Sequence, residues 1–328
     1  MANTTLVIIP TYNEVDNLPL IVDRVLTAQS GVDLLVVDDN SPDGTGAKAD
    51  ELAAAHPEVN VVHRAGKEGL LAAYREGFQW GLGRGYEVIC QMDADGSHAP
   101  EELGRLLDGI AQGADLVIGS RYVKGGEVKN WPRNRYLLSK LGNRYIALAL
   151  GEDVADMTAG YRAFRREVLE TIDLGSLSRK GYIFQVDLAR KAVEQGFDVR
   201  EVPITFEDRT LGESKLDASF AGESLVEVTK WGVEKKSTFV REGAREAGKL
   251  LRYEVDHSGL WKLRRRAGEV PELVINMIAE GGKLAGYELR HAGAGDLPRK
   301  AARAADAAVE LVREGVRLGE HEVGGHTR

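Results

Sequence analysis

Short apolar runs rich in Val, Ile and Leu alternate with longer stretches of helical periodicity over the first 120 residues. The runs are 6–9, 34–37, 59–62, 88–92 and 116–118, and the helical patterns between them lie near 18–29, 45–55, 69–83 and 100–111. Strands that alternate with helices form right-handed βαβ units, which build a parallel sheet flanked by helices. The pattern therefore predicts an α/β fold with a mostly parallel central sheet.

The regular alternation of strand and helix patterns ends after residue 120. Residues 121–134 have the composition of a loop, and the later pattern predicts helices at 135–150 and 182–195, a strand at 198–206, a polar loop at 207–217 and an amphipathic segment at 219–235. The apolar stripe of that segment suits an interfacial helix or packing on the sheet. Residues 237–328 are rich in Gly and contain an Ala-rich helical pattern near 298–318. We expect one folded domain over 1–236 and a C-terminal appendage of helix and loop, of unknown role, over 237–328.

Charge divides unevenly between these two parts. The chain has 328 residues and a net charge of −8. Residues 237–328 carry 16 Lys and Arg against 14 Asp and Glu, so residues 1–236 have a net charge of −10. An acidic body argues against a general nucleic-acid-binding protein, which needs a basic footprint. No secretory signal and no apolar stretch of about 18 residues is visible, so we expect a cytoplasmic protein without a transmembrane helix.

Two aspartates follow the apolar run 88–92. Asp93 and Asp95 flank Ala94 at the point where a buried strand would end. In α/β proteins this edge of a parallel sheet binds ligands. Because close carboxylates repel each other unless a cation neutralises them, a divalent metal that holds a diphosphate is a natural partner. The other interpretation is a loop with a helix cap, since acidic residues often precede helices.

Polar and aromatic residues also follow the first two strands. Pro10, Tyr12 and Glu14 come after run 6–9, and Val37 and Asp39 lie at the end of run 34–37. Strands 1, 2 and 4 of a doubly wound sheet can deliver such loops to one crevice. Neither Gly-x-Gly-x-x-Gly after the first strand nor a P-loop motif is present, which argues against a Rossmann dehydrogenase and a P-loop enzyme. The alternative for each loop is ordinary turn chemistry.

A family resemblance emerges from the order of these motifs. Val7 to Glu14, Val37 to Gly44 and Asp93 to Asp95 resemble the inverting GT-A glycosyltransferases of family 2. The resemblance narrows to the dolichol- or polyprenol-phosphate mannosyltransferases through four further motifs: Gly119 to Tyr122, Asp156 to Arg162, Gly181 to Gln185 and Asp208 to Leu216. It extends over residues 4–235 and implies a GT-A nucleotide-diphospho-sugar transferase fold, which makes 1–236 the catalytic domain.

The resemblance implies a role for each matching residue. Pro10, Tyr12 and Glu14 would line the nucleotide pocket, and Val37 and Asp39 would hold a guanine base. The sugar and diphosphate would be contacted by Asp93, Ala94 and Asp95, with the two carboxylates on Mg²⁺ or Mn²⁺. The family often has Gln where this chain has Ser97, whose shorter side chain makes a direct metal contact doubtful. Phosphates would be bound by Arg121, Arg209 and Lys215, and the acceptor phosphate also by Arg135, Ser139 and Arg162.

The implied activity is metal-dependent, inverting transfer of mannose from GDP-mannose to a polyprenyl monophosphate. Because the acceptor is a lipid, we expect a peripheral protein on the cytoplasmic face of a membrane. One alternative is a sibling transferase that uses UDP-glucose or another UDP-sugar. A second is a non-catalytic nucleotide-sugar-binding module, which the retention of both aspartates and the phosphate cations disfavours.

Overall fold

The computed structural model describes residues 4–178, 183–207 and 227–234. The chain divides into two units, Met1–Thr229 and Lys230–Arg328, and the first contains the fold considered below. Residues 227–234 are helical, whereas the predicted helix at 298–318 and most of the segment 219–235 lie outside the described residues. In the described part of the chain no helix combines the length and the apolar character needed to span a bilayer.

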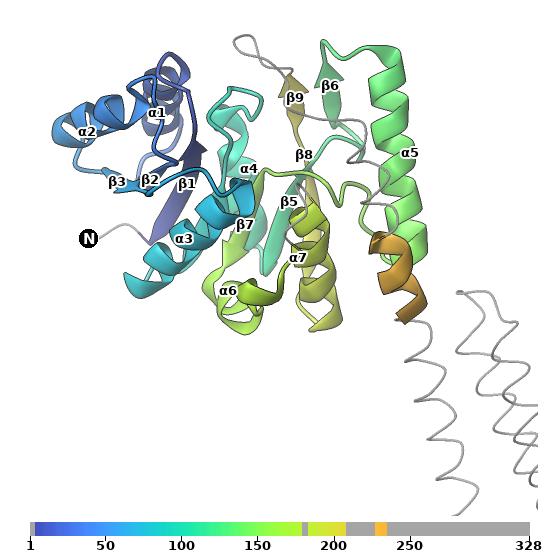
Figure 1. The fold of residues 1–328 in the computed structure, drawn as a ribbon. Helices are drawn as coiled ribbons and strands as arrows, with labels where there is room; N and C mark the ends of the chain where they lie inside the picture. Colours follow the sequence, from blue (N-terminus) through green and yellow to red (C-terminus); the bar gives the residue numbers. More distant parts are fainter. Residues whose placement is uncertain (1–3, 179–182, 208–226, 235–328) are drawn as a thin grey trace, which may run out of the picture. The chain divides into compact units, whose positions relative to one another are not determined.

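The predicted alternation of strands and helices is confirmed in the N-terminal half (Figure 1). The strands are β1 (Thr5–Thr11), β2 (Val32–Asp38), β3 (Val59–His63), β4 (Val88–Gln91) and β5 (Leu116–Ser120). The helices between them are α1 (Asn17–Ala28), α2 (Thr45–Ala55), α3 (Leu70–Gly83) and α4 (Leu103–Ala111), with a short 3₁₀ turn, η1 (Pro100–Glu102), before the last. Pro100 begins this 3₁₀ turn.

The second half differs more from expectation. Its elements are β6 (Glu127–Lys129), α5 (Arg133–Leu150), β7 (Arg162–Arg165), α6 (Arg166–Thr171), η2 (Leu174–Ser176), α7 (Ile183–Glu194), β8 (Val199–Pro203) and β9 (Thr205–Glu207). The single strand predicted at 198–206 is two strands in different sheets. Pro203 ends the first, because proline has no backbone N–H to continue a ladder. The predicted loop 121–134 contains β6, and β7 was not predicted.

The sheet order explains why the fold remains mostly parallel. Seven strands follow the order β3-β2-β1-β4-β7-β5-β8, and β6 and β9 form a separate two-stranded sheet. Only β7 runs antiparallel to its neighbours β4 and β5 among the described strands. The predicted α/β class with a mostly parallel sheet is confirmed.

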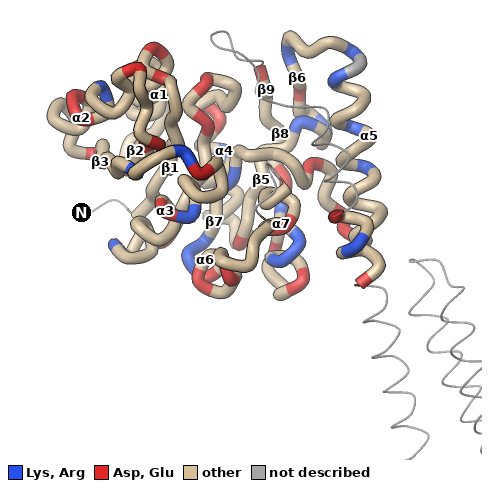
Figure 2. The backbone as a smooth tube through the Cα atoms, viewed as in Figure 1, with Lys and Arg blue, Asp and Glu red and all other residues tan. Residues whose placement is uncertain are grey.

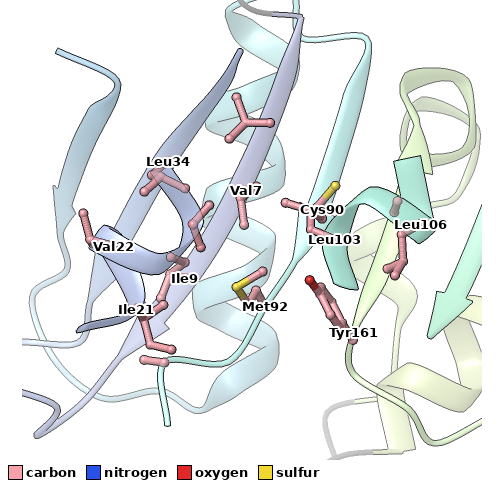
Figure 3. Close-up of a cluster of buried hydrophobic side chains, with 14 of the residues drawn as sticks. Val7, Ile9, Ile21, Val22, Leu34, Cys90, Met92, Leu103, Leu106 and Tyr161 are labelled. Atoms are coloured by element: carbon pink, nitrogen blue, oxygen red, sulfur yellow. The ribbon is translucent and has the colours of Figure 1, made fainter. Parts of the chain in front are cut away.

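Helices cover both faces of the large sheet. On one face Val7 and Ile9 of β1 pack with Ile21 of α1 and Leu106 of α4, in the core cluster of Figure 3. On the other face α3 lies so close to β1 that a Cβ at Gly77 would meet Ile8 Cγ2 at 2.7 Å. Alternate residues of β1 therefore face opposite helical layers, as the period of a strand requires.

Candidate active site

The loops that carry the predicted site all leave one edge of the sheet. β1, β2, β4 and β5 end there at Thr11, Asp38, Gln91 and Ser120. Because β1 lies between β2 and β4, the three loops with polar residues are neighbours. This is the carboxyl edge at which open α/β sheets bind ligands.

The loops after β1 and β2 are hydrogen-bonded to each other. The backbone N–H of Asn13 donates to Ser41 Oγ at 3.1 Å, and that of Glu14 donates to Thr45 Oγ1 at 2.9 Å. Pro10 pairs with Val37 in the strand register. The side chain of Val37, which was predicted to hold the base, is fully buried.

A buried ion pair orients the predicted base-binding carboxylate. Asp39 pairs with Arg64, which follows β3, and only 7% of either side chain is exposed. Arg64 also donates to Glu68 at 2.8 Å. Burial raises the pKa of Asp39, while the hydrogen bond and charge of Arg64 act in the opposite direction. The guanidinium therefore holds the carboxylate at a defined position on the sheet edge.

Tyr12 lies against the same part of the edge. Lys67, in the loop between β3 and α3, places its Nζ 3.9 Å from the centroid of the Tyr12 ring. Sequence reasoning missed both Lys67 and Arg64. They follow the apolar run 59–62, so the edge rule that selected Asp39 could also have selected them.

The loop after β4 holds the two aspartates in fixed positions. Tyr74 Oη donates to Asp93 Oδ1 at 3.1 Å, and the backbone N–H of Asp93 donates to His98 Nδ1 at 3.0 Å. Since His98 Nδ1 accepts, the ring hydrogen of the neutral imidazole lies on Nε2, which is 3.9 Å from Asp93 Oδ2. The Asp93 side chain is 30% exposed, so a ligand can reach it.

Ser97 positions the second aspartate. Its backbone N–H and its hydroxyl both donate to Asp95 Oδ1, at 3.1 and 2.6 Å. The residue is only 3% exposed. Its hydroxyl hydrogen is therefore engaged with the carboxylate, so Ser97 orients Asp95.

The donor set of this loop fits a magnesium or manganese ion bound together with substrate. Both ions favour oxygen ligands, and Mg²⁺ is usually held by one or two carboxylates plus substrate phosphates. In the part of the chain that the structure describes, no three His, Cys, Asp or Glu side chains group as a metal cage. The two aspartates fit an ion whose remaining ligands are phosphate oxygens and water.

Arg121 is part of a buried ion pair at the end of β5. Its Nε and Nη2 each lie 2.7 Å from an oxygen of Asp156, and Nη2 also donates to Thr158 Oγ1 at 2.9 Å. Coulombic attraction to Asp156 and its hydrogen bonds raise the pKa of Arg121 against the opposing effect of burial. The guanidinium is thus permanently charged and fixed. Its Nη1 makes no hydrogen bond to another described residue, so this nitrogen is the donor that a phosphate could use.

Arg162 does not reach the surface, which differs from its predicted contact with the acceptor phosphate. It is fully buried in β7. Its guanidinium donates to three main-chain carbonyls, those of Ala159, Gln185 and Met157, at 2.8, 2.7 and 2.8 Å. Burial lowers its pKa to about 9. Arg162 therefore holds the 156–160 loop in place, and we do not assign it to the acceptor.

The N-terminal part of α5 carries the other two predicted acceptor residues. The Arg135 guanidinium lies 4.1 Å from the centroid of the Trp131 ring, and the Arg121 guanidinium lies 5.6 Å from the same ring. Two cations thus share one indole, whose electron-rich faces attract them. Ser139 Oγ accepts a hydrogen bond from Tyr122 Oη at 2.7 Å, which leaves its own hydrogen to donate.

An aromatic row connects this cationic group to the aspartate loop. Trp131 lies edge-on to Phe206 at 5.5 Å, Phe206 lies edge-on to His98 at 5.8 Å, and His98 accepts from the backbone of Asp93. No sequence pattern indicated this row, because it joins three distant segments. A Cβ at Gly160 would lie 3.9 Å from Asp93 Oδ2, so the 156–160 loop also borders the aspartates.

The remaining predicted phosphate residues, Arg209 and Lys215, lie outside the described residues.

Together the fold and the site define a class of protein. A mostly parallel sheet with carboxylates, polar loops and fixed cations on one edge has the arrangement of a GT-A glycosyltransferase. Residues 6–173 match the description Glycosyl transferase family 2. The chain belongs to this family and is an enzyme of the transferase class.

Two curated relatives are similar over most of their length. A polyprenol monophosphomannose synthase of Mycolicibacterium smegmatis is 61% identical over 230 residues, which cover 70% of this chain and 87% of that protein. An undecaprenyl-phosphate mannosyltransferase of Micrococcus luteus is 53% identical over 228 residues, which cover 70% of this chain and 93% of that protein. The resemblance to mannosyltransferases predicted from the motifs is confirmed.

Among solved structures, the fold is similar to glucosyl-3-phosphoglycerate synthase from Mycobacterium tuberculosis in complex with Mn²⁺, UDP-glucose and phosphoglyceric acid. The TM-score is 0.52 at 20% identity, and the match covers 70% of this chain and 80% of that chain. At this identity the likeness concerns the fold alone, and it supports the GT-A assignment.

Proposed function

We propose that this protein transfers mannose from GDP-mannose to a polyprenyl monophosphate, with inversion at the anomeric carbon. The identity of 61% to a polyprenol monophosphomannose synthase carries the proposal. The separation of the site into a carboxylate loop and a cationic group supports it. Asp93 and Asp95 suit the donor diphosphate, while Arg121, Arg135 and Ser139 suit an anionic acceptor.

The chemistry requires little proton transfer. A phosphate monoester has a second pKa of about 6, so its attacking oxygen is largely ionised near neutral pH. The enzyme then needs cations that bring an anionic acceptor beside an anionic donor, rather than a strong general base. Arg121 and Arg135, which share the Trp131 ring, supply that charge from fixed positions.

The donor would be held by the opposite part of the edge. Asp39, which pairs with Arg64, would accept hydrogen bonds from N–H groups of a guanine base. Asp93 and Asp95 would hold Mg²⁺ or Mn²⁺, which as a Lewis acid stabilises the leaving nucleoside diphosphate. Arg209 and Lys215 are proposed to bind phosphates on the strength of the motif resemblance. Because the acceptor is a membrane lipid, we also infer peripheral docking at the cytoplasmic face.

A transfer assay tests this function. Full-length protein is incubated with undecaprenyl phosphate and either radiolabelled GDP-mannose or UDP-glucose, with Mn²⁺, with Mg²⁺ or with EDTA. We expect labelled lipid from GDP-mannose only, and only with metal. Product from UDP-glucose without product from GDP-mannose would show that the protein is instead a transferase that uses a UDP-sugar. No lipid product from either donor, together with measurable nucleotide-sugar binding, would indicate a non-catalytic module.

A further inference from the structure

The outer face of α5 is apolar and exposed. Seven large hydrophobic side chains are exposed in the part of the chain that the structure describes, and five of them lie on α5. They are Leu137, Leu138, Leu141, Tyr145 and Leu148, with exposed fractions of 56, 67, 63, 40 and 67%. Such a concentration on one helix differs from the scattered apolar residues of ordinary surfaces and marks an interaction site.

Helical geometry places these side chains on a single stripe. At 3.6 residues per turn the five fall within an arc of about 100°. The buried residues of α5, Asn143, Ile146 and Leu150, lie on the opposite side and pack against the protein. The Tyr145 hydroxyl is bonded to Thr229 Oγ1 at 2.6 Å, which anchors the stripe near its C-terminal end. The helix thus presents one apolar face to its own domain and a second apolar face outward.

Charge identifies the kind of partner. The exposed cations Arg133, Lys140 and Arg144 lie within an arc of about 40° beside the apolar stripe. α5 contains no Asp or Glu, although the chain as a whole has a net charge of −8 (Figure 2). An apolar stripe bordered by Lys and Arg is the pattern of a helix that lies in the interface of an anionic bilayer.

We infer that α5 is the surface on which this protein docks to anionic membranes, with Leu137, Leu138, Leu141 and Leu148 inserted among the lipids and the three cations at the headgroups. The helix has 18 residues, so it would lie in the membrane plane over about 27 Å. The same helix carries Arg135 and Ser139. If the proposed function holds, docking brings these acceptor residues to the depth of the lipid phosphate while the polyprenyl chain stays in the bilayer.

The docking surface is tested without any acceptor lipid. Full-length protein is sedimented with vesicles of phosphatidylcholine alone or with phosphatidylglycerol added. We expect binding that rises with phosphatidylglycerol and falls with salt. The triple variant Leu138→Gln, Leu141→Gln, Leu148→Gln should lower the partition coefficient about hundredfold, since each leucine loses its apolar transfer energy. Replacing Arg133, Lys140 and Arg144 by Gln should remove the preference for phosphatidylglycerol.

Leu20→Gln is the matched control. Leu20 is 59% exposed on α1, which Figure 1 draws away from α5, and its replacement should leave vesicle binding unchanged. Thermal unfolding of the triple variant, expected at the wild-type temperature, verifies that the fold is intact. Wild-type-like vesicle binding by the triple variant would overturn the inference. So would a dimer by light scattering that the triple variant converts to monomers, because α5 would then bind a second copy.

A kinetic measurement separates this inference from the proposed function. With a water-soluble short-chain acceptor the triple variant should keep the wild-type kcat and KM, whereas with long-chain acceptor in vesicles its KM should rise at least about tenfold. If no mannosyl transfer occurs with any acceptor, the proposed function fails while the vesicle-binding result stands on its own. An equal loss of activity on both acceptors would contradict a docking role for α5.

Discussion

Arg121 and Asp156 form a bidentate ion pair that is almost completely removed from solvent, with two N–O distances of 2.7 Å. Asp156 also accepts the backbone N–H of Arg121 at 3.0 Å. Thr158 and Asn143 extend the network to α5, since Asn143 donates to Thr158 Oγ1 at 2.9 Å. The pair thus ties the end of β5 to the 156–160 loop and to the helix that carries the proposed acceptor residues.

Removal of Asp156 should therefore be severe. Asp156→Ala leaves the Arg121 charge buried and unpaired, and we expect a loss of about 3–5 kcal/mol in the free energy of unfolding, measured with urea. Glu170→Ala is the control, because Glu170 pairs with Arg166 at the surface and should cost less than about 1 kcal/mol. The double variant Arg121→Met, Asp156→Leu should regain most of the stability but no activity. A loss below about 1 kcal/mol in Asp156→Ala would contradict this account.

The contact between Ser97 and Asp95 makes a second prediction. Asp95→Asn should abolish metal-dependent turnover, because the proposed metal site would lose one of its two carboxylates. Ser97→Ala should weaken Mn²⁺ activation by about tenfold, since the hydroxyl orients Asp95. The dependence of rate on Mn²⁺ concentration measures both effects, and Ser176→Ala, at an exposed position, serves as control. Unchanged Mn²⁺ dependence in Ser97→Ala would show that Asp95 needs no such support.

The Arg64–Asp39 pair predicts an effect on donor binding. Arg64→Met frees the Asp39 carboxylate from its buried partner, and we expect the KM for the nucleotide sugar to rise about tenfold or more with a smaller change in kcat. Arg64→Lys should recover part of the affinity, because a lysine restores the charge without the second hydrogen-bond arm that reaches Glu68. Equal KM values for wild type and Arg64→Met would show that the Arg64–Asp39 pair does not contribute to donor binding. Arg105→Met, an exposed arginine at 52%, is the control.

Acid sensitivity should involve Asp43, whose carboxylate accepts hydrogen bonds from the backbone N–H and the hydroxyl of Thr45, the first residue of α2. Burial raises the pKa of Asp43, but hydrogen bonds from Thr45 and Val15 outweigh it and hold this pKa below the ordinary value of 3.8. A carboxyl whose pKa is lowered on folding stabilises the fold above its unfolded pKa and loses that effect as pH falls through the folded pKa. Asp43→Ala should cost about 1 kcal/mol at pH 7, measured by urea unfolding. This difference should shrink once the pH falls below 3.8. A difference that is independent of pH would rule out a stabilising role for the charge of Asp43.

The sequence predicted the regular half of the fold because that half follows from local periodicity. Helix α2 was expected at 45–55 and is Thr45–Ala55, since a helical pattern is a local signal. Strand β7 was not predicted from the sequence, because Arg162–Arg165 has only two apolar residues between arginines. It belongs to the sheet through its pairing with β4 and β5, which lie far away along the chain.

The candidate site shows the same division. Asp93 and Asp95 could be selected from their position after an apolar run, and the edge rule placed them beside Asp39 and Tyr12. Arg162 and Arg121 are both arginines and were both predicted to bind phosphate. In the structure Arg162 donates to three main-chain carbonyls, whereas Arg121 pairs with Asp156. Burial and partner choice separate them, and neither is encoded within a short window of sequence.

By itself the sequence determined the alternation of strands and helices, the carboxyl edge that bears the aspartates and the family to which the chain belongs, because these depend on period, spacing and motif order. Only the tertiary structure decided that Arg121 pairs with Asp156, that the Trp131 ring lies near two arginines, and that α5 exposes an apolar stripe. The physical reason is that a side chain's partner and exposure are set by long-range packing, which places residues distant in sequence side by side.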